Sequence, residues 1–232
     1  MALPIMVLGD VGTGKSESAA NLDPTSTFYI HTDKKPLSLP GAEKNYKTVY
    51  KENGKLDLQN SNYYEGNDIA VVKALLTQIS DNLPHIKTIV IDTITSLMVD
   101  DFMGRLKEKG FDKYNDMAQD VYTLITMLRD LRSDLVVIVM SHVENNYDSD
   151  GVLKTSYKVP GGKLIGQNIK PEAYFNMVLY TDVTMQSTGP RYSFLTQNNG
   201  KNTCRSPRGL FTESKIPNDL AYVISEYQNF MQ

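Results

Sequence analysis

The sequence predicts an α/β protein with a mostly parallel central sheet flanked by helices and a C-terminal antiparallel hairpin. Three observations lead to this fold class. A glycine-rich loop follows an apolar run at residues 3–8, two later apolar runs end in polar side chains, and segments with a helical apolar rhythm separate them. Strands that alternate with helices are typical of parallel sheets, because each crossover between parallel strands needs a connection about as long as a helix.

The glycine-rich loop is the most specific motif. Residues 9–16 match G-x-x-x-x-G-K-S, the P-loop pattern. Such glycines let backbone N–H groups turn toward phosphate oxygens, while Lys15 supplies an ammonium for the β- and γ-phosphates and the Ser16 hydroxyl can ligate Mg²⁺. A helix from near Gly14 to Asn21 would add its positive N-terminal end. A glycine-rich turn that matches by chance is the competing interpretation. The predicted nucleotide-binding residues are Gly9, Asp10, Val11, Gly12, Thr13, Gly14, Lys15, Ser16 and Glu17.

Length and composition are those of an ordinary globular domain. With 232 residues, 41% of them hydrophobic, the chain can bury a full core, and we expect a single domain over residues 1–232. Its one cysteine, Cys204, excludes an intramolecular disulfide and suits a reducing cytoplasm. The longest strongly apolar run, residues 135–140, is too short to span a bilayer. The sequence therefore predicts a soluble protein with no membrane partner.

Positive charge is concentrated in two segments, although the formal net charge is −3. Residues 152–171 and residues 187–212 each carry four Lys or Arg side chains and no Asp or Glu. A solvated face is the ordinary explanation of such a run. The segregation also allows a basic groove on an acidic body.

Two aspartates follow predicted strands at the edge where the ligands of open α/β sheets collect. Asp33 comes just after a strand predicted at residues 27–31, and a buried run at residues 87–91 leads directly into Asp92. In a chain with a P-loop, Asp92 is predicted to be the Walker B acid that holds the hydration shell of Mg²⁺ together with Ser16. A helix-cap role stays open for Asp92, and a cap or turn role for Asp33.

A third buried strand, residues 135–140, ends in Ser141 and His142. A polar pair beside a bound nucleotide could sense the γ-phosphate or the attacking water, although His142 could equally be a hydrogen-bonded core histidine. The remaining predicted elements are helices at 68–83, 96–109, 112–132 and 217–230, a strand at 47–50, a polar connection at 53–66, and hairpin strands at 175–184 and 192–197.

Residues 144–171 are predicted to form a long, flexible, basic loop, because they are rich in Asn, Asp, Ser, Gly and Lys. Lysines for phosphates and an aromatic ring for base stacking suit single-stranded DNA. A disordered surface loop without a ligand is the alternative. The predicted DNA-binding residues are Lys154, Tyr157, Lys158, Lys163 and Lys170.

The order of these parts resembles the RecA/RadA-type ATPase core. More closely, it resembles the small phage-encoded RecA-like nucleotide-binding proteins, which include single-strand annealing proteins. The segments that carry the resemblance are residues 9–16, 89–92, 137–142, 159–164 and 205–210, and it covers nearly the whole chain. It implies a P-loop NTPase of RecA type that uses ATP and Mg²⁺ and acts on single-stranded DNA in recombination or annealing, in the cytoplasm of an infected bacterium.

The resemblance also implies residue roles. Asp33, shorter than the glutamate of the family, would activate water, and His142 would be the polar sensor. Arg205 and Arg208, with Lys201 as a third candidate, would reach the γ-phosphate of a neighbouring subunit. The predicted catalytic residues are therefore Lys15, Asp33, Asp92, His142, Arg205 and Arg208.

The resemblance also bears on the expected assembly, and two other function classes stay open. The chain starts at its first core strand, without the N-terminal oligomerisation segment of the family, so the expected homo-oligomer is a ring or short filament. A single-strand binding protein is a further expected partner. The alternatives are a nucleotide-gated, non-catalytic loader or assembly module, and a P-loop kinase of small molecules. The kinase would want a lid with several arginines, whereas this loop carries lysines.

Overall fold

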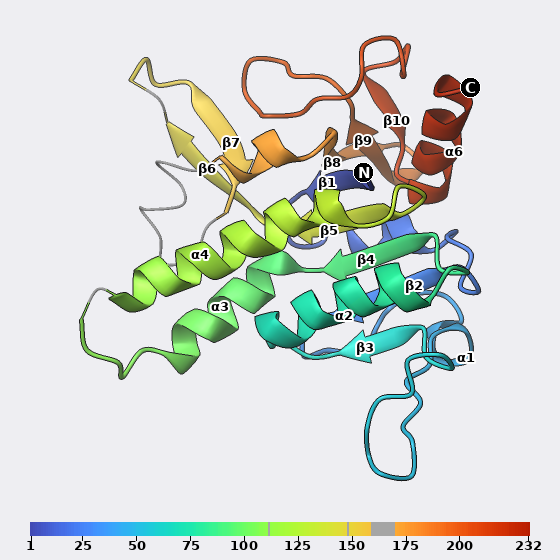
Figure 1. Cartoon of the computed structure of the whole chain (residues 1–232). Coiled ribbons are helices and arrows are strands. Elements are labelled where there is room, and N and C mark those ends of the chain that lie inside the picture. Colours follow the sequence, from blue (N-terminus) through green and yellow to red (C-terminus); the bar gives the residue numbers. More distant parts are fainter. Residues whose placement is uncertain (111, 148, 159–169) are drawn as a thin grey trace.

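The computed structural model describes residues 1–110, 112–147, 149–158 and 170–232. Within them, one large sheet is flanked by helices, and a small hairpin projects from one end (Figure 1). The sheet strands are β1 (Leu3–Leu8), β2 (Thr27–His31), β3 (Tyr63–Glu65), β4 (Thr88–Asp92), β5 (Val136–Ser141), β8 (Met177–Gln186), β9 (Gly189–Leu195) and β10 (Lys215–Pro217), and the hairpin strands are β6 (Val143–Tyr147) and β7 (Leu153–Tyr157). The helices are α1 (Ala42–Asn45), α2 (Ile69–Asn82), α3 (Ile94–Gly104), α4 (Asp112–Met127) and α6 (Leu220–Phe230), with 3-10 turns η1 (Ser16–Ala19), η2 (Leu128–Asp130) and η3 (Pro171–Tyr174).

The sheet runs in the order β10-β9-β8-β1-β5-β4-β2-β3. Neighbouring strands from β8 to β3 are parallel, and β8, β9 and β10 pair antiparallel. The predicted fold class, a mostly parallel sheet flanked by helices with a C-terminal antiparallel hairpin, is therefore confirmed. Because β5 lies between β1 and β4, the strands that lead to the P-loop, the polar pair and Asp92 all end at one edge.

Side chains of the central strands fill two cores, one on each face of the sheet. On β5, Val137 and Val139 belong to the core beneath α2, α3 and α4, whereas Ile138 and Met140 belong to the core that includes η1 and α6. Figure 1 shows α2, α3 and α4 side by side along one face. Every residue of β1, β2, β4 and β5 is buried. Burial on both faces explains why these strands are continuous apolar runs in the sequence.

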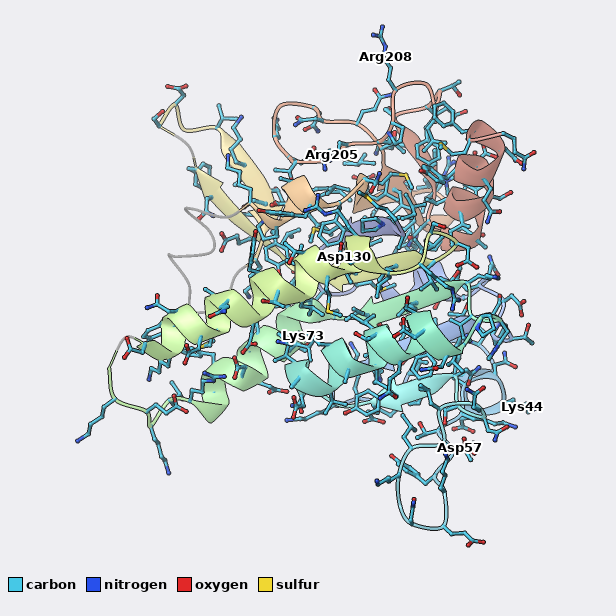
Figure 2. The ribbon with its side chains drawn as sticks, viewed as in Figure 1. Lys44, Asp57, Lys73, Asp130, Arg205 and Arg208 are labelled. Atoms are coloured by element: carbon cyan, nitrogen blue, oxygen red, sulfur yellow. The ribbon has the colours of Figure 1, made fainter. Side chains whose placement is uncertain are left out.

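Helix α2 shows how local signals set its limits. Asp68 caps its first turn by accepting hydrogen bonds from the backbone N–H groups of Ala70 and Val71. Val72 and Ile79 lie on its buried face, as the apolar spacing predicts. The helix packs beside α4, and the ammonium of its Lys73, labelled in Figure 2, lies 2.7 Å from a carboxylate oxygen of Asp120.

The prediction of a helix after the P-loop is wrong, because the chain forms only the 3-10 turn η1 there. Ser18 donates its hydroxyl hydrogen to the carbonyl of Lys15 at 2.5 Å. Serine side chains that bond nearby backbone compete with regular helix, and Pro24 would interrupt a helix that continued past η1. The C-terminal helix also begins later than predicted, at Leu220, because residues 215–217 pair with β9 and Asp219 caps the helix.

Two other local predictions are wrong. Residues 47–50 form no strand, and β3 lies instead within the predicted polar connection. The ring of Tyr63 in β3 stacks near that of Tyr29 in β2 at 6.5 Å, a contact between segments that a local pattern does not reveal. The predicted flexible loop at 144–171 begins with the paired strands β6 and β7. Its residues 159–169 lie outside the described residues.

Among the helices that the structure describes, none has the combined length and apolar composition needed to cross a lipid bilayer.

Candidate active site

The P-loop leaves the carboxyl end of β1 between two parallel neighbours. Leu8 is paired with Ser141 of β5 and with Tyr180 of β8. A Cβ atom at Gly9 would collide with the hydroxyl of Thr181, so only glycine fits there. Gly14 has a φ of 91°, a left-handed conformation that favours glycine. The pattern therefore requires glycine at these two positions for steric and backbone reasons.

Side chains hold the loop in shape before any phosphate binds. The carboxylate of Asp10 accepts a hydrogen bond from the N–H of Val11 at 2.7 Å, and the hydroxyl of Thr13 donates to the carbonyl of Asp10 at 2.7 Å. From outside the motif, Thr181 donates to the hydroxyl of Thr13 at 2.6 Å. The amide of Asn218 donates to the carbonyl of Gly14 at 2.9 Å.

The ammonium of Lys15 is folded over the loop and almost fully buried, with 6% of the residue exposed. It donates to the carbonyls of Gly9 and Asp10 at 2.9 and 2.7 Å and lies 3.3 Å from Nδ1 of His142. Burial lowers the pKa of Lys15 to about 8, although Asp92 and Asp10 oppose this shift. Phosphate oxygens would replace these carbonyls with stronger acceptors.

Asp92 ends β4 in an almost completely buried position. One carboxylate oxygen, Oδ2, accepts a hydrogen bond from the hydroxyl of Tyr29 at 2.7 Å. The other, Oδ1, is buried and has no hydrogen-bond partner among the described residues. The helix-cap alternative does not apply, because the side chain that caps α3 is that of Thr93.

Asp33 lines the same cavity as Asp92, because β2 and β4 pair in parallel with His31 opposite Asp92. Its carboxylate accepts a hydrogen bond from the hydroxyl of Ser96 and forms an ion pair with Lys35 at 2.8 Å. Burial alone would raise the pKa of Asp33, but the hydrogen bonds from Lys35 and Ser96 outweigh it and hold this pKa below its ordinary value. Asp33 is therefore a carboxylate at neutral pH.

The polar pair at the end of β5 is tied to helix α3. The hydroxyls of Ser141 and Thr95 are 2.8 Å apart, and the backbone N–H of His142 donates to Thr95 at 2.9 Å. Burial, together with the charge of Lys15, lowers the pKa of His142, so its ring is neutral at pH 7. The carbonyl of His142 accepts a hydrogen bond from the N–H of Lys158 at 3.1 Å.

These groups line one open cavity of about 610 Å³ over the P-loop. It brings together five of the predicted site residues whose side chains carry the chemistry, namely Lys15, Ser16, Asp33, Asp92 and His142. Val11, Gly12 and Gly14 from the motif also line it, with Glu17, Lys35, Ser38, Thr93 and Tyr192 from outside it.

The cavity suits a nucleotide with its metal. Gly12, Gly14 and Lys15 of the loop line the cavity where the phosphates would lie. The unpartnered Oδ1 of Asp92 is a hard oxygen donor of the kind that Mg²⁺ and its water ligands prefer, and the Ser16 hydroxyl is a second. A buried acceptor without a partner costs free energy, which a hydrated cation would recover.

A second hollow of about 530 Å³ adjoins the first and shares Val11, Asp33, Lys35 and His142 with it. Its wall also carries Lys34, Lys158, Asp10 and Asp100, and Lys34 forms an ion pair with Asp100 at 3.3 Å. Lys158, a predicted DNA-binding residue, is thus close to the nucleotide cavity.

The other predicted DNA-binding residues are spread out. Lys154 donates to the carbonyl of Gly200, and Lys170 is exposed at the start of η3. The stacking role of Tyr157 is wrong: only 3% of this residue is exposed, and its hydroxyl contacts the sulfur of Met98 at 3.4 Å. The ring faces inward and belongs to the core beneath α2, α3 and α4. Lys163 lies outside the described residues.

Arg205 and Arg208 are exposed, and neither is among the described residues that line the nucleotide cavity. The guanidinium of Arg205 donates to the carbonyls of Ala173 and Phe175, which holds it against η3. Figure 2 shows the side chain of Arg208 pointing away from the molecule. Arg208 is therefore the freer of the two to reach a neighbouring subunit. Lys201, the third candidate, is exposed as well.

Several site residues were not predicted from the sequence. Tyr29 and Ser96 contact the two aspartates, and Tyr192 comes from the distant strand β9. No local pattern marks these three. Lys35 could have been found, since it follows Asp33 closely in the sequence and carries the opposite charge.

Comparisons with known proteins identify a family. The model of the AAA domain family matches residues 1–207. No curated protein matches the sequence significantly. Among solved structures, a KaiC-like protein from the hyperthermophilic archaeon Pyrococcus horikoshii is similar to this chain, with 14% sequence identity and a TM-score of 0.44. The similarity covers 83% of this chain and 77% of that one.

Proposed function

The chain belongs to the AAA domain family, and on that premise we propose that it binds ATP with Mg²⁺, hydrolyses the γ-phosphate and couples this reaction to single-stranded DNA. One observation carries the proposal. A single cavity over the P-loop combines a buried lysine, two carboxylates and a neutral histidine, namely Lys15, Asp33, Asp92 and His142. Phosphoryl transfer to water uses a lysine on the phosphates, a carboxylate for the metal and a group that orients the water, and this cavity offers a residue for each of these roles.

Each group has a distinct task in the proposed reaction. Lys15 moves from the loop carbonyls to the β- and γ-phosphates and neutralises charge there. Ser16 and Asp92 would hold Mg²⁺, which supplies further charge stabilisation when bound. Asp33 accepts a proton from the attacking water, for which its low pKa keeps it ionised. His142, 3.3 Å from Lys15, hydrogen-bonds the water or the γ-phosphate.

The ion pair between Asp33 and Lys35 bears on turnover. A carboxylate held at 2.8 Å by an ammonium and also bonded to Ser96 is a weak base. Hydrolysis then requires Lys35 to leave Asp33, for which the γ-phosphate offers an alternative anion. The same observation favours the second candidate function, a nucleotide-gated module that binds ATP tightly and turns over negligibly.

Single-stranded DNA and a second copy of the chain complete the proposal. Lys158 and Lys170 offer cations for a DNA backbone, and the bond between Lys158 and His142 offers a path from nucleotide to DNA. Arg208 of a neighbouring subunit would supply positive charge to the γ-phosphate. A role in phage recombination or annealing, and contact with a single-strand binding protein, belong to the same proposal.

An ATPase assay with and without an oligonucleotide tests the proposal. We expect Mg²⁺-dependent hydrolysis that DNA stimulates, loss of nucleotide binding in Lys15→Ala, and retained binding with at least about a 100-fold lower rate in Asp33→Asn. Tight binding without turnover would favour the module instead. Transfer of phosphate to a small acceptor would favour a kinase, and hydrolysis by Lys15→Ala at the parent rate would overturn the assignment of the site.

The salt dependence of DNA affinity tests which lysines contact DNA phosphates. If Lys158 and Lys170 each contact one phosphate, each alanine variant lowers the slope of log affinity against log salt concentration by about 0.7. Lys44, on the opposite side of the molecule from Arg208 in Figure 2, provides the control, because Lys44→Ala leaves the slope unchanged. Equal slopes for all three variants would contradict a specific DNA path.

A further inference from the structure

The carboxylate of Asp92 is held asymmetrically. Its Oδ2 accepts the hydroxyl hydrogen of Tyr29 at 2.7 Å, whereas its Oδ1 is buried without a hydrogen-bond partner among the described residues. Only 1% of Asp92 is exposed, and the residue lines the nucleotide cavity. A carboxylate buried in this way leaves one oxygen for a ligand and assigns the other to the protein.

Tyr29 is itself fixed in place. The residue is fully buried in β2, next to β4 in the sheet. Its ring packs edge-on against Tyr46, with centroids 5.4 Å apart, and stacks near Tyr63 at 6.5 Å. The hydroxyl therefore approaches Asp92 from one direction only, and it can act toward a carboxylate only as a donor.

We infer that Tyr29 is a positioning residue for the metal: by holding Oδ2 it fixes the rotation of the Asp92 carboxylate, so that Oδ1 faces the hydration shell of Mg²⁺. The inference rests on the proposed nucleotide site and adds to it a residue from a strand that contributes nothing to the P-loop. Removal of a residue that orients a metal-ligating carboxylate typically lowers the metal affinity by about 10- to 100-fold.

A purely structural role makes a different prediction. If Tyr29 only fills the core, removal of its hydroxyl weakens folding and affects nucleotide binding equally with and without metal. If it positions Asp92, the loss appears only where metal contributes. Tyr29→Phe distinguishes these roles because it keeps the ring and deletes one oxygen. Tyr63→Phe is the matched control, since this neighbouring phenol contacts Nδ1 of His31 at 3.0 Å.

The experiment measures the affinity for nucleotide and the affinity for metal separately. Calorimetry gives the affinity for ADP in EDTA, and electron paramagnetic resonance gives the affinity of the ADP complex for Mn²⁺. For Tyr29→Phe we expect Mn²⁺ affinity to fall by at least about 10-fold while metal-free ADP affinity stays within about twofold. For Tyr63→Phe both stay at the parental values. Parental Mn²⁺ affinity in Tyr29→Phe, or an equal loss in both measurements, would overturn the inference and leave the proposed function intact.

A double variant covers the case in which Tyr29→Phe changes the fold locally. If Tyr29 acts through Asp92, Mn²⁺ binds the Tyr29→Phe/Asp92→Asn chain no more weakly than the Asp92→Asn chain. Additive losses of Mn²⁺ affinity in the double variant would mean that Tyr29 does not act through Asp92. A parent protein that binds no ADP under any condition would overturn the proposed function and this inference together.

Discussion

At the residue scale, the site depends on charges that burial makes costly. Lys15 is held by two backbone carbonyls, Asp33 by Lys35 and Ser96, and Asp92 by Tyr29. Lys15 and Asp33 thus have partners that a ligand can replace, whereas Asp92 keeps one oxygen without a hydrogen-bond partner among the described residues. The free protein is therefore prepared for an anion and a cation at defined atoms.

ADP binding should be accompanied by proton uptake at the buried Lys15. The pKa of Lys15 is about 8 in the free protein, below the ordinary 10.5, so at pH 8 about half of the Lys15 side chains are neutral. Phosphates hold the lysine charged. ADP binding at pH 8 should therefore take up about half a proton per site, and almost none at pH 7.

Calorimetry in buffers of different ionisation enthalpy measures this uptake. Lys15→Arg is the control, because an arginine stays charged throughout this range and should take up no proton. Equal uptake by the parent protein and by Lys15→Arg at pH 8 would show that another group is responsible.

At the element scale, the ends of helices and strands depend on residues far from them in the sequence. Arg132, after η2, donates from one guanidinium nitrogen to the carbonyls of Ile79 and Leu83 at 3.0 and 2.8 Å, and also contacts the carbonyl of Ile86. These carbonyls close the C-terminal end of α2 and the turn that leads into β4. One side chain thus supports the connection that places Asp92.

Removal of this guanidinium should destabilise the fold. Arg132→Ala leaves several carbonyls without their charged donor, and we expect the free energy of unfolding in urea to fall by roughly 2 to 4 kcal/mol. Arg129→Ala provides a comparison, because Arg129 lies over the ring of Tyr174 at 5.1 Å and should lose about 1 kcal/mol or less. Similar losses in the two variants would argue against the capping role.

The junction between β1 and the P-loop offers another element-scale test. A methyl group at Gly9 would overlap the hydroxyl of Thr181 on β8, so Gly9→Ala should weaken ADP binding by at least about 10-fold. Thr181→Gly in the same chain should restore part of that affinity by making room. Gly12→Ala meets no atom within 4 Å and serves as the comparison for backbone strain alone. No rescue by the second substitution would contradict the steric explanation.

At the scale of the whole molecule, both ends of the chain meet at the nucleotide. The P-loop follows the first strand, whereas Tyr192 of β9 lines the same cavity and Asn218, before α6, donates to the carbonyl of Gly14. Asn21 also donates to Asp219 at 2.8 Å. The C-terminal hairpin and helix are therefore coupled to the loop that binds phosphate, and an interface near them would respond to nucleotide.

Mixing two inactive variants tests whether a neighbouring subunit completes the site. If the charge arrives from the next subunit, Arg208→Ala should bind ATP normally but hydrolyse it about 1000-fold more slowly. Lys15→Ala cannot bind ATP but still carries Arg208. A mixture should regain hydrolysis as the subunits form mixed interfaces.

Light scattering of the same mixture gives the oligomeric state. Arg191→Ala, a change of an exposed arginine on β9, should hydrolyse ATP at the parent rate. No recovery in a mixture that scatters as an oligomer would argue against Arg208 as the residue supplied in trans, and a strictly monomeric protein would argue against trans action altogether.

The sequence by itself determined the P-loop, the buried parallel strands, the C-terminal hairpin and the two aspartates at strand ends. These follow from local patterns, because a strand buried on both faces must be apolar and a phosphate loop must have glycines. Only the tertiary structure decided that Tyr29 holds Asp92, that Lys35 pairs with Asp33 and that Tyr157 faces inward. Such contacts depend on strand order, register and packing between distant segments, which local spacing does not specify.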